Sequence, residues 1–185
     1  MYNAGCFYGK GIKKKTAVAG DEVTYSLMLR QMQKASAIQH KGIASRHAYS
    51  MDGIDYYCGI RDEDIGILRQ KYDVIILDIG FENTFDNTNV TFARMVSRLS
   101  ACDEKILAGS MLPWKSRECE KKMERIERFL DIRGLKMVTL AACDKEAVSI
   151  IKKHGVEVVL IPFERNPFVI SGENLRSFLE LLKIT

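Results

Sequence analysis

The stretch Tyr72-Asp-Val-Ile-Ile-Leu-Asp78 decides the fold, because four large apolar residues, three of them β-branched, stand between two aspartates. Such a short, uninterrupted apolar run is typical of a strand buried on both faces, as in a parallel sheet. Three similar runs follow it in the chain. They are Lys105-Ile-Leu-Ala-Gly109, Lys136-Met-Val-Thr-Leu-Ala-Ala142 and Val156-Glu-Val-Val-Leu-Ile161.

Weaker strand patterns precede this stretch, at residues 16–19 and 53–57, and helical patterns separate the runs. The helices are expected at residues 24–34, 89–99, 116–130 and 144–154, and the amphipathic residues 175–183 are expected to pack on the sheet. This alternation predicts an α/β fold with a doubly wound, mostly parallel sheet of about six strands and helices on both faces. Residues 1–185 are expected to form a single domain, with residues 1–15 as a basic N-terminal lead-in.

The composition is that of an ordinary globular domain, with 46% hydrophobic and 28% charged residues, which excludes disordered and collagen-like chains. The net charge of +4 is uneven, because residues 1–50 carry 8 Lys or Arg against 2 Asp or Glu. Four of these eight basic residues lie in Lys10–Lys15. Such a cluster indicates either an anion-binding segment or a solvated basic face.

The five cysteines show no CxxC spacing, so neither a zinc site nor a disulfide framework is predicted. No apolar stretch approaches the roughly 18 residues that span a bilayer, and the first ten residues lack the layout of a signal peptide. We therefore expect a cytoplasmic protein with no transmembrane segment. His40, His47 and His154 lack the spacing of metal ligands and are interpreted as surface or helix-end residues.

The basic segment from Gly9 to Thr16 nearly fits the phosphate-loop pattern GxxxxGK[ST], with Lys14 in place of the second glycine. Two interpretations stay open. The segment is either a phosphate-binding loop or a basic lead-in to a strand at residues 16–19. The two interpretations make different structural predictions, because a working phosphate loop connects a strand to a helix, whereas a lead-in continues directly into a strand.

The same segment, Lys10-Gly-Ile-Lys-Lys-Lys-Thr16, resembles the deviant Walker A motif KGGxGKT of the ParA/MinD ATPases, which have a P-loop NTPase fold. Lys10, Gly11, Lys15 and Thr16 match the motif, while Ile12 and Lys14 replace glycines. The resemblance implies that the first lysine reaches across a homodimer, that Lys15 holds phosphates, and that ATP and Mg²⁺ are the cofactors. A non-glycine residue in left-handed backbone costs about 1 kcal/mol, so the two replacements favour a degenerate loop that binds no cofactor.

Tyr72–Asp78 resembles the Walker B strand of the same family, which implies that Asp78 serves the magnesium ion together with Thr16. Ile79 stands where the family has a hydroxyl residue. The run that closes on Pro162 is similar to the late strand whose following loop surrounds the nucleotide base. If residues 16–19 are instead the family's second strand, Asp21 lies near the family's catalytic carboxylate.

These observations predict a P-loop NTPase-like module with a degenerate or missing nucleotide loop. It is expected to bind a protein partner in a bacterial partitioning, septum-site or pilus-assembly system, with a nucleic acid as a further candidate partner. One alternative is an active ParA/MinD-like ATPase. The other is a receiver-like phosphoacceptor, in which Asp21 and Glu22 bind magnesium, Asp78 accepts the phosphoryl group and Ser110 is the switch residue. Pro113-Trp-Lys115 is a place where a ligand or partner could touch the only tryptophan.

Overall fold

The computed structural model describes residues 14–20, 36–37, 47–51, 53–79, 89–132, 134–142, 144–163 and 171–182. The chain divides into two compact units, each with its own sheet. Unit 1 comprises Met1–Thr88 and Asn166–Ile170, and unit 2 comprises Asn89–Arg165 and Ser171–Thr185. The expectation of one domain over residues 1–185 stays a prediction. No described helix has the length and apolar character needed to cross a membrane.

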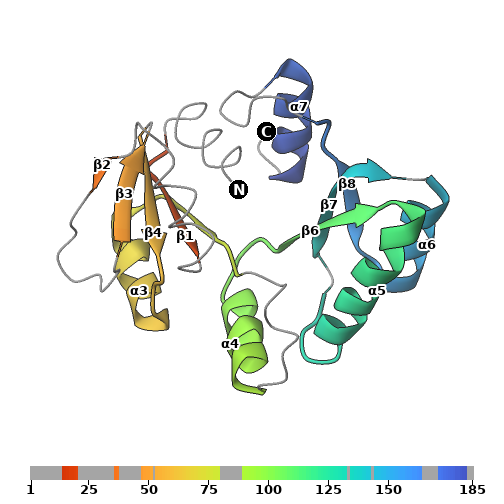
Figure 1. Cartoon of the computed structure of the whole chain (residues 1–185), viewed down its shortest axis with the longest axis horizontal. Coiled ribbons are helices and arrows are strands. Elements are labelled where there is room, and N and C mark those ends of the chain that lie inside the picture. The colour runs from red at the N-terminus through yellow and green to blue at the C-terminus, as the bar shows by residue number, and fades with distance from the viewer. Residues whose placement is uncertain are drawn as a thin grey trace. The chain divides into compact units, whose positions relative to one another are not determined.

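Unit 1 contains a five-stranded sheet in the order β2-β3-β4-β1-β5 (Figure 1). β1 is parallel to both of its neighbours, β4 and β5, whereas β3 is antiparallel to β4 and to β2. Gly53, with a φ of +79°, lies in the two-residue connection between β3 and β4, where such a left-handed backbone suits glycine. The strands are β1 Thr16–Gly20, β2 Ser36–Ala37, β3 His47–Met51, β4 Ile54–Cys58 and β5 Val74–Leu77.

The small apolar residues of β1 are buried on both faces of this sheet. Val18 packs on one face against a cluster that includes Ile54 and Tyr56. Ala17 and Ala19 face the opposite side, where Tyr57 and Leu68 pack against them. Burial on both faces explains why β1 is short of polar side chains and lies inside the sheet instead of at its edge.

Helix α3, Asp62–Lys71, connects β4 to β5 and packs through Leu68 on the Ala17 and Ala19 face. Its start is stabilised by the fully buried Asp64, whose carboxylate accepts a hydrogen bond from the Arg61 backbone N–H at 3.0 Å. The same carboxylate lies 3.5 Å from the Arg61 guanidinium, which raises the pKa of Arg61. A carboxylate in the first turn also suits the positive end of the helix dipole.

Unit 2 contains a three-stranded parallel sheet in the order β6-β7-β8. Helix α5 connects β6 to β7 and helix α6 connects β7 to β8, and the two helices contact each other (Figure 1). Met123 of α5 and Met137 of β7 are fully buried in this unit. The elements are α4 Asn89–Ser100, β6 Ile106–Met111, α5 Pro113–Glu127, β7 Lys136–Ala142, α6 Asp144–His154, β8 Glu157–Leu160 and α7 Gly172–Leu181.

Lys136 is a buried lysine at the start of β7. Its ammonium donates a hydrogen bond to the backbone carbonyl of Leu181 and lies 3.1 Å from the Glu104 carboxylate. Leu181 is the last residue of α7, where the helix dipole favours a positive charge. Lys136 therefore attaches the end of α7 to the sheet of unit 2.

The α/β class is confirmed, but a single doubly wound sheet of about six strands is not what the described residues form. All six expected strands are present, as β1, β4, β5, β6, β7 and β8, divided between two sheets. The additional strands β2 and β3 pair antiparallel, and β3, His47-Ala-Tyr-Ser-Met51, carries too many polar residues to resemble a buried run. The helix expected at residues 24–34 lies outside the described residues.

Candidate functional site

The order of the strands in unit 1 reverses at β1, which has β4 on one side and β5 on the other. Open α/β sheets bind ligands at such a point, beyond the carboxyl ends of the parallel strands. The residues there are Gly20, Gly59 and Asp78, which we call the β1 edge. The backbone N–H of Gly59 donates to the Gly20 carbonyl at 2.9 Å, and that of Asp78 donates to the Ala19 carbonyl at 2.7 Å.

Asp78 is the half-buried carboxylate of the β1 edge and directly follows β5. Gly59 has a φ of +66°, a left-handed conformation that keeps the backbone free of a side chain beside Gly20. In the part of the chain that the structure describes, Asp78 belongs to no cluster of three or more possible metal ligands. The described β1 edge thus contains one carboxylate, that of Asp78, beside the hydrogen-bonded backbone of Gly20 and Gly59.

Lys15 and Thr16 lie at the opposite, amino-terminal end of β1. The Lys15 backbone N–H donates to the Asp73 carboxylate at 2.8 Å, and its ammonium lies 4.9 Å from the centre of the Tyr72 ring. The Thr16 hydroxyl is buried and donates to the Lys14 carbonyl at 2.9 Å. The described part of the basic segment therefore leads directly into a strand.

The strand separates the residues that the resemblance placed on one magnesium ion. Asp78 is level with the end of β1, because its N–H bonds to Ala19, whereas Thr16 begins β1. At about 3.3 Å per residue, Thr16 and Gly20 are roughly 13 Å apart. The structure therefore does not bring Thr16 and Asp78 together. Gly9, Lys10, Gly11 and Asp21, the other predicted site residues of this region, lie outside the described residues.

Two tyrosine hydroxyls and one carboxylate form a hydrogen-bonded chain beside the amino-terminal end of β1. The hydroxyls of Tyr57 and Tyr72 are 2.7 Å apart, and Tyr72 donates to the Asp55 carboxylate at 2.5 Å. Burial raises the pKa of Tyr57 to about 12, and the Asp55 charge acts in the same direction against the lowering effect of the Tyr72 hydrogen bond. Burial, followed by the hydrogen bond to Asp55, raises the pKa of Tyr72. Both hydroxyls are therefore protonated at physiological pH, which suits packing more than proton transfer.

Pro162, the residue expected near a nucleotide base, belongs to unit 2 and follows β8. Its carbonyl accepts a hydrogen bond from the side-chain amide of Asn174 at 3.0 Å. Asn174 is buried near the start of α7, and its backbone N–H donates to the capping hydroxyl of Ser171. In the described residues, Pro162 thus joins the end of β8 to α7.

Comparison with solved structures identifies a similar fold, whereas the sequence comparisons identify no relative. No protein-family model and no curated protein matches the sequence. Among solved structures, the chain is similar to MinD in the MinC:MinD cell division protein complex of Aquifex aeolicus. The TM-score is 0.67 at 13% identity, and the match covers 100% of this chain and 89% of that chain. The chain has a MinD-like fold.

This fold agrees with the ParA/MinD resemblance as far as architecture is concerned. At 13% identity the likeness extends to the fold alone. The similarity does not show the deviant phosphate loop, and the described residues Lys14 and Lys15 lead directly into β1. The roles assigned to Asp21, Lys15 and Pro162 stay predictions.

One cluster of polar side chains was not predicted from the sequence. It consists of Glu120 and Glu124 of α5 and His154 of α6. His154 ends α6, as expected for a helix-end residue, but it is buried, with 6% of its surface exposed. The spacing of four residues between the glutamates indicates one helix face. The partner helix is about 30 residues away in the chain, and no local pattern identifies it.

Proposed function

We propose that this chain is a MinD-like positioning module of a bacterial septum-site, partitioning or pilus-assembly system, which acts by binding a protein partner without turning over ATP. The similarity to MinD over the whole chain carries this proposal, because MinD in the matching structure is in complex with MinC. A partner of the MinC type is therefore the first candidate. A homodimer and a nucleic acid are further candidates, the latter because of the basic residues near the N-terminus.

The residues after β1 support a degenerate nucleotide site. A phosphate loop needs glycines for close backbone approach and a lysine for the phosphate charge. The chain leaves β1 as Gly20-Asp21-Glu22, and no further glycine or lysine occurs before Lys34. These two acidic residues directly follow the central strand β1 in the sequence, and their negative charge disfavours phosphate. This distribution of charge favours the degenerate site over the active ATPase.

The first experiment measures melting temperature and phosphate release with MgATP. We expect no shift in melting temperature and no ATP turnover, because the exposed Lys15 lies at the end of β1 opposite to the β1 edge. A ligand at 100 times its Kd stabilises a protein by about 2.7 kcal/mol, which would raise Tm by roughly 5–10 °C. The absence of such a shift at millimolar MgATP therefore excludes physiological binding.

Three variants separate the rival interpretations. A shift that Lys15→Ala abolishes and Lys14→Ala does not would support the active ATPase with the predicted loop and overturn the proposal. A shift in melting temperature that Asp78→Asn abolishes would instead assign ATP to the β1 edge. Beryllofluoride binding that Asp78→Asn abolishes would support the receiver-like phosphoacceptor.

The second experiment concerns the partner. Trp114, the only tryptophan, is 75% exposed near the start of α5. Exposed tryptophans are enriched among the residues that dominate protein interfaces. We expect calorimetry to show that MinC, the partner of MinD in the matching structure, binds this chain. Trp114→Ala should weaken this binding by about 30-fold, equivalent to about 2 kcal/mol. Phe163→Ala, which removes an equally exposed aromatic ring, serves as the control. Equal losses in both variants would show that Trp114 has no special part, and no binding at all would refute a MinC-type partner.

A further inference from the structure

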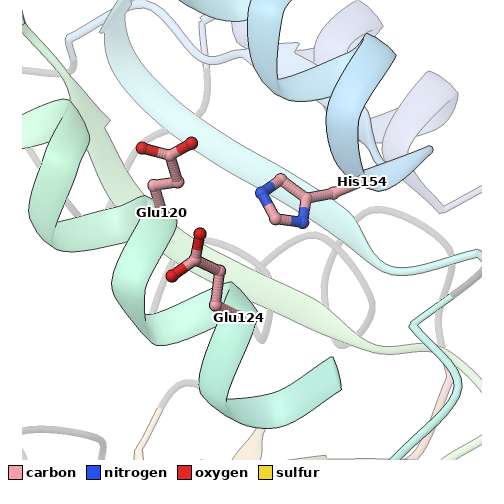
Figure 2. Close-up of side chains that lie close together, drawn as sticks. All are labelled: Glu120, Glu124 and His154. Carbon is pink, nitrogen blue, oxygen red and sulfur yellow. The ribbon is translucent and has the colours of Figure 1, made fainter. Parts of the chain in front are cut away.

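Two helices of unit 2 bring three possible metal ligands together. Glu120 and Glu124 lie one turn apart on α5, and His154 faces them from the end of α6 (Figure 2). One ligand atom from each of the three lies within 4.8 Å of the others. Both helices belong to unit 2, so the geometry depends on that unit alone.

The two ring nitrogens of His154 have different environments. Nδ1 lies 3.1 Å from the Glu127 carboxylate, whereas the buried Nε2 has no hydrogen-bond partner. Figure 2 shows the Nε2 side of the ring turned toward Glu120 and Glu124. A carboxylate beside Nδ1 favours the tautomer with the proton on Nδ1, which leaves a lone pair on Nε2. Metal-binding histidines are commonly oriented by a carboxylate in this way.

Lys153 is the group that now neutralises the two carboxylates. Its ammonium lies 2.6 Å from a Glu120 oxygen and 2.8 Å from a Glu124 oxygen. These contacts raise the pKa of Lys153, and the hydrogen bond from Lys153 lowers the pKa of Glu124. The Lys153 side chain is 48% exposed, so it can turn into solvent without leaving a cavity. A cation that binds both glutamates therefore competes with Lys153 for the same oxygens.

We propose that His154 Nε2, Glu120 and Glu124 bind one divalent transition-metal ion, with Zn²⁺ as the best fit. One imidazole and two carboxylates suit Zn²⁺, whereas Mg²⁺ and Ca²⁺ prefer oxygen ligands alone. Bonds of about 2.0–2.2 Å in a tetrahedron place ligand atoms roughly 3.3–3.6 Å apart, so small side-chain rotations close the present cluster. Glu127 orients the imidazole. The ion replaces Lys153 and links α5 to α6, and water takes the fourth position.

Cobalt is a useful probe, because Co²⁺ in a four-coordinate site absorbs visible light. We expect saturable binding of one Co²⁺ per chain, displacement by Zn²⁺, and a rise in Tm with either ion. Glu120→Gln and Glu124→Gln should each weaken binding by about 100-fold, and Glu127→Gln by about 10-fold as a residue that orients a ligand. Glu118→Gln is the matched control on the same helix, since Glu118 pairs with Lys122. Its metal affinity should equal that of the unmodified chain.

Lys153→Met distinguishes a metal site from an ion pair alone. If a cation competes with Lys153, this variant binds Co²⁺ about 10-fold more tightly than the unmodified chain. If the cluster is only an ion pair, neither the unmodified chain nor Lys153→Met binds Co²⁺. His154→Gln should abolish the cobalt absorbance. Because His154 is buried and this variant could fail to fold, the Glu120→Gln/Glu124→Gln double variant provides the same test with half-exposed residues. Absence of saturable binding, or equal binding by Glu118→Gln and Glu124→Gln, overturns the proposal.

Discussion

Replacing Gly109 of β6 by alanine is expected to lower the free energy of unfolding by about 2 kcal/mol, within the range for overpacked cores. A methyl group at this position would lie 2.6 Å from the Cys119 sulfur and 2.9 Å from the terminal carbon of Met137. Both side chains are buried, and the Cys119 thiol also bonds to the Ser110 carbonyl at 3.4 Å. Urea unfolding of the two proteins measures the difference.

Two further variants test whether the close approach of α5 to β6 is the cause. Gly66→Ala makes the same change in α3, where an added carbon meets no atom within 4 Å beyond the backbone of its own helix and its chain neighbours, and should stabilise the protein by up to about 1 kcal/mol. Cys119→Ala removes the nearer clashing atom, so the Gly109→Ala/Cys119→Ala pair should recover more than about 1 kcal/mol relative to additivity. Strict additivity would contradict the packing explanation.

The buried hydroxyl of Tyr57 should cause the free energy of unfolding to fall as the pH rises from about 10 to 12. The pKa of Tyr57 is about 12 in the folded chain and 10.0 without the fold. The unfolded chain therefore loses this proton first as the pH rises, and the free energy of unfolding falls by up to about 1.4 kcal/mol per pH unit for one group. Below pH 10 both states are protonated, and the contribution is fully present.

The comparison with Tyr57→Phe isolates this group from the other titrating residues. The variant should lose about 1 kcal/mol at pH 7, because the Tyr72 hydroxyl still donates to Asp55, and its stability should fall less steeply above pH 10. Tyr49→Phe, on the neighbouring β3, is the control. Parallel curves for the unmodified chain and Tyr57→Phe would show that the Tyr57 hydroxyl has the same pKa in both states.

The strongest sequence predictions concerned elements whose patterns are local. The run Val74-Ile-Ile-Leu77 is a strand, and the weaker pattern at residues 16–19 is also one, which places the basic residues before it in the chain. Helix α3 was not predicted, because Asp62–Lys71 carries few apolar residues and only a shallow amphipathic pattern. Its start depends on the contact of Asp64 with Arg61, which is evident only once the helix is formed.

The positions of the candidate site residues show the same division. The position of Asp78 could be predicted, since an aspartate that ends an apolar strand lies at the carboxyl edge of a parallel sheet. Its distance from Thr16 could not be predicted, because it depends on the register in which β5 pairs with β1. His154 illustrates the limit further, since its three carboxylate neighbours, Glu120, Glu124 and Glu127, come from α5, which precedes β7 in the chain, whereas His154 follows β7.

The sequence by itself determined the α/β class, the six apolar or small-residue strands and the location of the positive charge, because periodicity and composition act over a few neighbouring residues. The tertiary structure alone decided which residues meet. It placed Lys15 and Asp78 at opposite ends of β1, and it brought His154 to Glu120 and Glu124. The physical reason is that strand register and helix packing are set by burial of side chains far apart in the chain, and no local pattern encodes those pairings.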